Sequence, residues 1–294
     1  MKLLKLFIFI LAGVVMAVPA LASPFATEVV SATVTTTSTL YDDPESVLGK
    51  PTTWIKGSDV GGVDMAASMA YPAWNTDPDG NELIVTLSPG DQITVTFDHD
   101  IVDDPNNPYG IDFIVYGNDL YWGSGMVYSD TDMDEYYIST GGGWSDPGVV
   151  SVAQYEDGPW YTFTTGPYFD TTTYPTQAFA WDSENDTWGD ELDWTKPVDP
   201  DLDPTEDFAG LSVAEVIDLY DGSAGGTGYD LADLYDLYGV ELEWIRYIRV
   251  ESNGTSYCEV DGFADVAAVP VPAAVWLLGS GLLGLFGIRR KMKV

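Results

Sequence analysis

Cysteine and histidine are almost absent from this chain of 294 residues, which contains one of each. A single cysteine excludes a disulfide framework, and we expect Cys258 to be a small buried residue rather than a reactive thiol. His99 has no second histidine or cysteine with which to form a zinc site or a nucleophilic triad. We therefore expect no enzyme. A polysaccharide-active enzyme stays open as an alternative, because glycosidases need only two carboxylates at a set separation.

Basic side chains are also scarce: the chain has 11 Lys and Arg but 47 Asp and Glu. Six of these cations lie in the two terminal segments, so residues 23–268 hold five cations against all 47 acids, a formal charge of −42. A surface this acidic repels nucleic acids and anionic bilayers, and we expect no nucleic-acid partner. Cations are its natural partners. Disorder is excluded because disordered acidic chains are poor in aromatic residues, whereas this region has nine tryptophans.

The first 22 residues are typical of a secretory signal peptide. Lys2 and Lys5 precede an apolar stretch, and Ala20-Leu21-Ala22 forms a cleavage site of small residues. A first transmembrane helix is the alternative, but the apolar core is short for one. We expect the mature chain to begin near Ser23 and to be exported across the inner membrane.

The last 26 residues, 269–294, combine a proline motif, an apolar segment and a basic end, in that order. The positions that carry this pattern are Val269, Pro270, Pro272, Ala273, Arg289 and Arg290. The tail resembles the C-terminal sorting signals of bacterial exosortase substrates, the PEP-CTERM group, in a VPxPA form. The resemblance implies an exosortase-type processing enzyme as partner and a destination at the cell surface or in the extracellular matrix.

The apolar segment of the tail, residues 273–288, would reach about 24 Å as a helix at ~1.5 Å per residue, short of the ~30 Å hydrocarbon core. We expect this short transmembrane helix to anchor the protein in the inner membrane only transiently, with cleavage near Pro272. Retention of the helix is the alternative.

Residues 23–268 are expected to form one acidic domain of short strands. Alternating apolar residues predict a hairpin over 83–97, around a turn at Ser88 to Asp91. Residues 110–118 are apolar on both faces, which predicts a central strand. A second hairpin is predicted over 148–163, with Asp157-Gly158 as its turn. Two more strands are expected from the alternation in residues 243–252 and 259–269.

Helical spacing occurs in one stretch only, residues 210–220, where Ser212 is placed to cap the helix. Residues 164–209 have few periodic signals but many aromatic and acidic residues, so we expect a long insertion there. Many short strands with little helix predict an all-β protein, a β-sandwich or barrel.

Two further resemblances bear on the fold. The segments "VSVAQYEDGPWYTF" (150–163) and "IRYIRVES" (245–252) are similar to strands of galactose-binding-like jelly-roll domains, which implies a jelly-roll β-sandwich. A family of bacterial cell-surface proteins of undefined role resembles the chain in four places. These are "LGKP" (48–51), "NPYGIDFIVYGN" (107–118), "GGTGYDLADL" (225–234) and "VDGFADVAAV" (260–269).

Acidic loops between strands predict a structural Ca²⁺ ion, because this cation prefers six to eight oxygen ligands. Four segments qualify, residues 75–82, 103–112, 129–135 and 199–207, and none is an EF-hand. A solvated acidic surface is the alternative for each. The candidate ligands are Asp103, Asp104, Asp112, Asp130, Asp132, Asp134 and Asp261. If the fold buries one or more aspartates among Asp112, Asp119, Asp230, Asp233, Asp261 and Asp265, we expect Arg246 and Arg249, the only arginines of the domain, to pair with them. Ligand recognition by these groups is the alternative.

Aromatic residues beside polar ones predict a sugar-binding site, since Trp rings stack on pyranose rings and Asp, Asn and Tyr bind hydroxyls. Packing of these residues in the core is the alternative. The candidates are Tyr116, Asn118, Asp119, Trp122, Trp181 and Trp188. We therefore expect an exported surface or matrix protein that binds extracellular polysaccharide with the support of Ca²⁺. A purely structural matrix component without a glycan site is the alternative.

Overall fold

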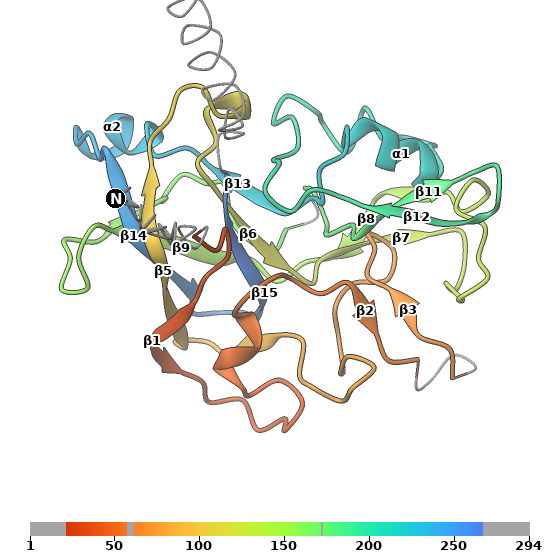
Figure 1. Ribbon diagram of the computed structural model, residues 1–294, viewed down its shortest axis with the longest axis horizontal. Coiled ribbons are helices and arrows are strands. Elements are labelled where there is room, and N and C mark those ends of the chain that lie inside the picture. Colours follow the sequence, from red (N-terminus) through yellow and green to blue (C-terminus); the bar gives the residue numbers. More distant parts are fainter. Residues whose placement is uncertain (1–21, 58–61, 172, 267–294) are drawn as a thin grey trace, which may run out of the picture.

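The computed structural model describes residues 22–57, 62–171 and 173–266. Two antiparallel sheets dominate it (Figure 1). The five-stranded sheet has the order β1 (Glu28–Thr33), β5 (Gln92–Val102), β14 (Trp244–Ser252), β9 (Gly148–Ala153) and β10 (Tyr161–Thr162). The four-stranded sheet has the order β13 (Thr227–Tyr229), β6 (Phe113–Gly117), β15 (Cys258–Asp265) and β4 (Val85–Leu87). The expectation of an all-β protein is confirmed.

The two sheets pack face to face over an apolar core. On β6, Phe113 and Val115 belong to this core with residues of the five-stranded sheet such as Val95 and Ile248. Phe113 is fully buried and stacks on Tyr229 of the neighbouring strand, with ring centroids 4.9 Å apart. Because side chains alternate between the two faces of a strand, those of Phe113 and Val115 lie between the two sheets.

The other face of the four-stranded sheet is covered as well, which makes β6 buried on both sides. Ile114 and Tyr116 of β6 join a second apolar cluster there. Its covering layer consists of short elements, seen on the right of Figure 1. These are β2 (Trp54–Ile55) with β3 (Met65–Ala66), β7 (Leu120–Gly123) with β8 (Ile138–Trp144), β11 (Phe179–Asp182) with β12 (Thr187–Glu191), and α1 (Val213–Leu219).

The covering layer includes the expected insertion and the expected helix. Residues 164–209 contribute the β11–β12 pair and bury Trp194 and Phe208 in the second cluster. Helix α1 begins after Ser212, whose side chain accepts a hydrogen bond from the Glu215 N–H while the Glu215 carboxylate accepts one from the Ser212 N–H. This capping box explains why the short helix begins there.

Two expectations about local structure are wrong. Strands β4 and β5 do not pair as a hairpin: they belong to opposite sheets, and the turn at Ser88 to Asp91 passes between the sheets. Both strands face the same core, so alternation alone could not distinguish the two arrangements. A second helix, α2 (Asp233–Tyr238), follows β13 and ends at Gly239 in the left-handed conformation. Two short 3-10 turns complete the described elements, η1 (Pro44–Val47) and η2 (Pro108–Gly110).

The central strand β6 and the β9–β10 hairpin are confirmed, with Tyr161 opposite Val152 in the hairpin. The expected signal-peptide residues 1–21 and the sorting tail 269–294, with its apolar segment 273–288, lie outside the described residues. Among the residues that are described, no helix has the length and hydrophobicity needed to cross a membrane.

Candidate metal centre

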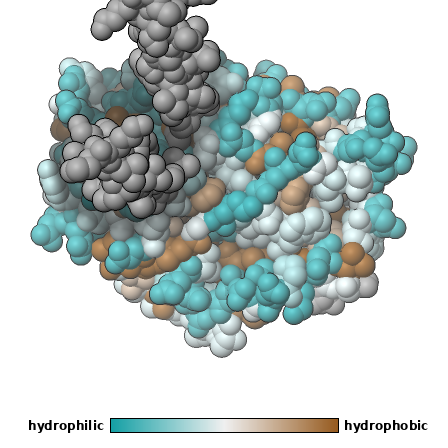
Figure 2. All heavy atoms as spheres, viewed as in Figure 1, coloured by the Kyte–Doolittle hydropathy of each residue, from teal (hydrophilic) through white to brown (hydrophobic). Residues whose placement is uncertain are grey.

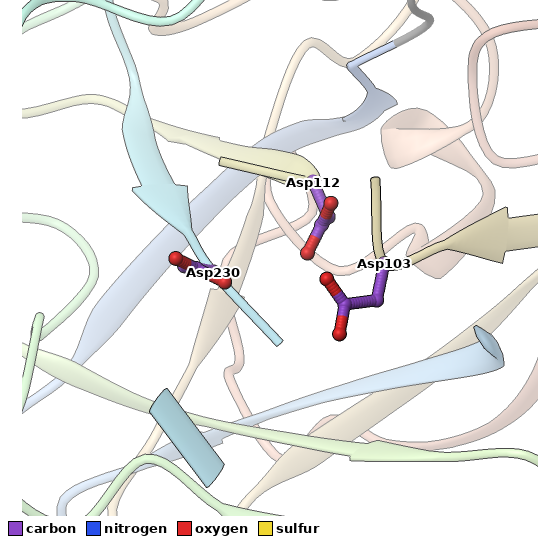
Figure 3. A group of neighbouring side chains, drawn as sticks. All are labelled: Asp103, Asp112 and Asp230. Atoms are coloured by element: carbon purple, nitrogen blue, oxygen red, sulfur yellow. The ribbon is translucent and has the colours of Figure 1, made fainter. Parts of the chain in front are cut away.

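Three aspartates that are far apart in the sequence meet at the start of β6. Asp103 follows β5, Asp112 precedes β6 and Asp230 follows β13, and one carboxylate oxygen from each lies within 4.8 Å of the others (Figure 3). Strand pairing brings them together, because Tyr229 of β13 lies opposite Phe113 of β6. Asp230, which follows β13, therefore lies beside Asp112, which precedes β6.

The loop from Asp103 to Asp112 is held by its own polar side chains. The Asp104 carboxylate accepts hydrogen bonds from the backbone N–H and the side-chain amide of Asn106, at 2.9 and 2.6 Å. At the end of the loop, Gly110 has a φ of 75°, and a Cβ there would lie 2.9 Å from Oδ2 of Asp230. Glycine thus permits both the turn and the close approach of Asp230.

Asp112 is fully buried at the centre of the group. Its Oδ1 accepts hydrogen bonds from the Asp104 N–H and the Asn107 amide, both at 3.1 Å, and its Oδ2 accepts one from the Leu231 N–H at 2.9 Å. Burial, together with the charges of Asp103 and Asp230, raises the pKa of Asp112 to about 6 despite these donors. Three carboxylates are therefore held together at the cost of repulsion.

The neighbouring carboxylates feel the same repulsion. Burial and the charges of Asp104 and Glu241 raise the pKa of Asp103. The pKa of Asp230 is raised by burial, with Asp233 and Asp103 adding to the shift. Among the described residues, no ion pair with Lys, Arg or His involves any of the three. A cation bound between them would remove the repulsion.

Asn107 adds an uncharged acceptor to the group. It is 6% exposed, its amide nitrogen donates to Asp112, and its Oδ1 is buried without a hydrogen-bond partner. Such an orphaned carbonyl is unfavourable unless something binds it. Three carboxylates and one amide carbonyl are the oxygen donors that Ca²⁺ prefers. The residues present therefore fit a hard divalent cation.

A cleft of about 590 Å³ opens beside this group. Asp230 and Asp233 line it on one side, and the rings of Tyr109, Tyr168 and Tyr174 line it elsewhere. Tyr109 and Tyr168 are 49% and 45% exposed, so their faces are available to a ligand. Because Asp230 belongs to both, a cation bound by the three aspartates would lie at the wall of the cleft.

A second acidic group lies in the covering layer. Carboxylate oxygens of Asp132, Asp134 and Asp186 come within 4.8 Å of one another. The Asp134 carboxylate already accepts hydrogen bonds from Trp181 Nε1 at 2.9 Å and from the Ser183 hydroxyl at 2.8 Å. These donors stabilise its charge without a metal, so we rank this group below the first.

Three of the expected ligands lie outside both groups. Asp104 helps to shape the first site but is not one of its three carboxylates. Asp130 is exposed and outside the second group. Asp261 is buried elsewhere and accepts hydrogen bonds from the N–H and hydroxyl of Thr52. Burial raises the pKa of Asp261 to about 7, despite the bonds from Thr52.

The two arginines do not pair with buried aspartates, contrary to expectation. Arg246 pairs with Asp100 at 2.6 Å, and both side chains are about 40% exposed. The Arg249 guanidinium lies 3.8 Å from the ring centroid of Trp160. An aromatic ring is a common partner of arginine, as an alternative to a carboxylate.

The expected sugar-binding residues are dispersed. Tyr116 is fully buried in the core and donates to the Trp194 carbonyl, so the expectation that it contacts a ligand is wrong. Asp119 is only 6% exposed, whereas Trp122 is 55% exposed. Asn118 lines a separate pocket of about 300 Å³ near the end of β6.

The two expected tryptophans of the insertion pack on each other. Trp181 and Trp188 make an edge-to-face contact with ring centroids 5.1 Å apart. Trp188 also lines a pocket of about 220 Å³ with Trp54 and Tyr128. Packing beneath their own hairpin therefore accounts for much of their surface.

Sequence reasoning missed Asp230 and Asn107 as candidate metal ligands, and it missed the tyrosine cleft. Asp230 lies far along the chain from Asp103, and only the pairing of β13 with β6 places it at the site. Asn107 lies inside residues 103–112, a segment that the sequence did single out. Its side-chain carbonyl could therefore have been included among the candidate ligands.

Comparison with known proteins identifies one segment of the chain. Residues 268–291 match the PEP-CTERM protein-sorting motif, which covers the tail that the sequence singled out, Val269 to Arg290 included. No curated protein matches the chain. The motif indicates an exported cell-surface protein that is sorted through its C-terminus and processed by an exosortase-type enzyme.

Proposed function

We propose that this surface protein binds extracellular polysaccharide through a Ca²⁺-supported cleft on a jelly-roll β-sandwich. One observation carries the proposal: the group of Asp103, Asp112 and Asp230 adjoins a tyrosine-lined cleft through Asp230, which belongs to both, and Asn107, whose Oδ1 has no hydrogen-bond partner, bonds to Asp112. Secretion across the inner membrane with transient anchoring by the tail would bring the domain to the polymer.

The ion would act on the shape of the cleft. Asp103 and Asp112 bracket the loop that carries Tyr109, and Asp230 begins the segment that leads into α2. A cation that ligates all three would tie this loop to that segment. It would also neutralise carboxylates whose burial otherwise opposes folding.

The cleft has the composition of a carbohydrate site. Tyrosine rings offer apolar faces for stacking on pyranose rings, and their hydroxyls bind sugar hydroxyls. Asp230 and Asp233 supply acceptors, and the volume of about 590 Å³ suits a few sugar residues. The lining contains no lysine or arginine, which favours neutral or cationic polymers over anionic ones.

The proposal is tested by binding of the exported protein to a panel of polysaccharides, with calcium and with chelator. We expect binding that needs calcium and falls about 2- to 12-fold in Tyr109→Ala, since loss of an aromatic stacking partner costs about 0.5–1.5 kcal/mol. Tyr137→Ala is the matched control, because Tyr137 is 48% exposed and outside the cleft lining. Absence of binding across diverse polymers in calcium would leave the purely structural matrix component. Release of sugar products would instead favour a polysaccharide-active enzyme.

A further inference from the structure

A pocket of about 300 Å³ lies at the opposite end of β6 from the metal centre. Its polar lining comes from Asn118, Asp146 and Glu259, and its aromatic lining includes Trp74, Trp144 and Tyr257. Trp144 and Tyr257 are 55% and 52% exposed, so their rings stand at an open rim. The pocket combines carboxylates with aromatic faces.

Acidic groups continue behind the pocket. The buried Asp170 carboxylate accepts hydrogen bonds from the N–H groups of Asn118, Asp119 and Glu259, at 3.2, 3.0 and 3.0 Å. It thereby ties the end of β6 to β15. Burial raises the pKa of Asp170 well above its ordinary value, and the charges of Asp119 and Glu259 add to the shift. For Glu259, burial and the charge of Asp146 raise the pKa to about 7.

Three buried oxygens in this region have no hydrogen-bond partner. They are Oδ1 of Asn118, Oδ2 of Asp119 and Oε2 of Glu259. Asp119 is only 6% exposed, and its charge acts on Asp170. Amide carbonyl and ionised carboxylate oxygens accept hydrogen bonds, so donor groups would satisfy all three.

Positive charge from the protein itself is directed elsewhere. The charged groups that shift the pKa values of Asp170 and Glu259 are carboxylates. The cations of the described chain that have visible partners bind outside the pocket: Lys50 with Glu191, Lys196 with Asp221, Arg246 with Asp100, His99 with Asp98 and Asp265, and Arg249 with Trp160. The compensating charge must therefore come from protons or from a ligand.

The aromatic residues favour an organic cation. Trp144 Nε1 donates to Oδ2 of Asp146 at 2.8 Å, which fixes the indole beside a carboxylate. Aromatic faces attract cations through their quadrupole, and carboxylates add direct charge. A primary ammonium group carries three donors and no acceptor, which suits the unpartnered oxygens of Asn118 and Glu259, the two that belong to residues lining the pocket, whereas a quaternary ammonium group has no donor.

We propose that the pocket of Asn118, Asp146, Glu259 and Trp144 binds a protonated primary amine, carried by an amino sugar or by a small aliphatic amine. The site is separate from the calcium centre, and the proposal does not depend on that centre. It extends the chemistry of the protein to cationic ligands, in keeping with the charge of −42 on residues 23–268.

The test is calorimetric titration of the exported protein, with chelator present, using n-butylamine, its N,N,N-trimethyl derivative and 1-butanol. Glucosamine and N-acetylglucosamine oligomers form the second arm and distinguish amino sugars from simple amines. We expect saturable binding of butylamine, weaker binding of the trimethyl derivative and none of butanol. Preference for the free amino sugar over its acetylated form would assign the amine to a carbohydrate.

Two variants locate the site. Glu259→Gln keeps the shape of the side chain and should weaken butylamine binding at least ~10-fold, the effect of losing a charged hydrogen bond. Trp144→Ala should weaken it about 3- to 30-fold. Trp122→Ala is the matched control, because Trp122 is also 55% exposed but lies outside the pocket lining, and it should change binding less than ~2-fold.

Two results would overturn the proposal: no saturable binding of butylamine, or equal binding of butylamine by Glu259→Gln and the parent. Neither of these concerns the calcium-dependent binding of glycans, which is measured without chelator and depends on Tyr109. Failure of the amine pocket and failure of the glycan cleft are thus separate outcomes.

Discussion

The two ends of strand β6 are both acidic, yet their acids are arranged differently. At its start, carboxylate oxygens of Asp103, Asp112 and Asp230 converge within 4.8 Å, beside the side-chain amide of Asn107. At its end, Asp146 and Glu259 line a pocket together with the aromatic residues Trp74, Trp144 and Tyr257. Converging oxygens suit a small hard cation, and carboxylates spaced around aromatic faces suit an organic one. Net charge alone does not tell these two kinds of site apart.

The charge is otherwise spread over the surface. Hydrophilic residues are spread over the face shown in Figure 2, among residues of intermediate hydropathy and smaller hydrophobic patches. Dispersed surface acids are solvated and screened, so they repel one another weakly. The two ends of β6 differ from this background because their acids are partly or fully buried.

Loss of the strand that carries both sites should have the largest effect. Phe113 is fully buried between the sheets and lies next to Asp112. Phe113→Ala should lower the free energy of unfolding by about 3–5 kcal/mol, because it leaves a cavity in the core. Denaturant unfolding measures this. Val102→Ala, at a position 52% exposed on β5, should stay within about 0.5 kcal/mol of the parent. Equal losses in the two variants would mean that β6 does not support both sites.

Removing the charge of Asp112, in the metal group, should distinguish the two ends of β6 in their response to calcium. At calcium concentrations about 100 times the dissociation constant, the parent should gain about 2.7 kcal/mol in unfolding free energy. Asp112→Asn should lose most of that gain, because a central ligand charge is removed. Thermal melts with calcium and with chelator measure it. Asp146→Asn, at the other end, should keep the full gain, and a calcium response that survives in Asp112→Asn would refute the assignment.

Removing charge from the other end should stabilise the protein. The pKa of Glu259 is about 7 in the folded state against 4.5 for an unburied group. Between those values the unfolded state releases its proton first, so this group costs stability as pH rises from about 4.5 to 7, and the cost is then constant. Glu259→Gln should therefore raise the unfolding free energy at pH 8 by on the order of 1–3 kcal/mol, with no gain at pH 4. Urea unfolding at both values checks it.

Glu156→Gln is the control for that experiment, because Glu156 is exposed in the turn between β9 and β10. It should change the unfolding free energy by less than about 0.5 kcal/mol at either pH. A destabilising Glu259→Gln at pH 8 would mean that the carboxylate is compensated within the protein.

The smallest effect concerns the glycine that admits Asp230 to the metal group. A Cβ on Gly110 would lie 2.9 Å from Asp230 Oδ2 and would also require a left-handed alanine. Gly90 has a φ of 91° and open space around it, so Gly90→Ala reports the backbone strain alone. Gly110→Ala should cost about 1 kcal/mol more than Gly90→Ala and should weaken calcium binding as well. Equal costs with unchanged calcium affinity would mean that Asp230 is free to move away.

Local patterns predicted the strands well where burial and turn chemistry agree. The apolar run of β6 indicated a strand covered on both faces, and Asp157-Gly158 marked the β9–β10 hairpin. The pairing of β4 with β5 was predicted wrongly because alternation shows which face is buried but not which sheet a strand joins. Helix α2 escaped notice because its six residues are too few for a periodic signal.

Only part of the candidate metal site could be predicted from the sequence, for the same reason. Asp103 and Asp112 share one acidic loop, so their proximity follows from the sequence, whereas Asp230 arrives only through the pairing of β13 with β6. Trp144 lies in a glycine-rich stretch that gave no sign of a pocket. The sorting tail, in contrast, is a linear motif, and it was found from the sequence alone.

A crystal structure of the exported protein grown with calcium tests the account most directly. We predict one ion bound by Asp103, Asp112, Asp230 and Oδ1 of Asn107, with oxygens at about 2.3–2.6 Å. The end of β6 near Asn118 and Glu259 should hold no metal. An ion at that end, or none at the start of β6, would contradict the distinction between the two sites.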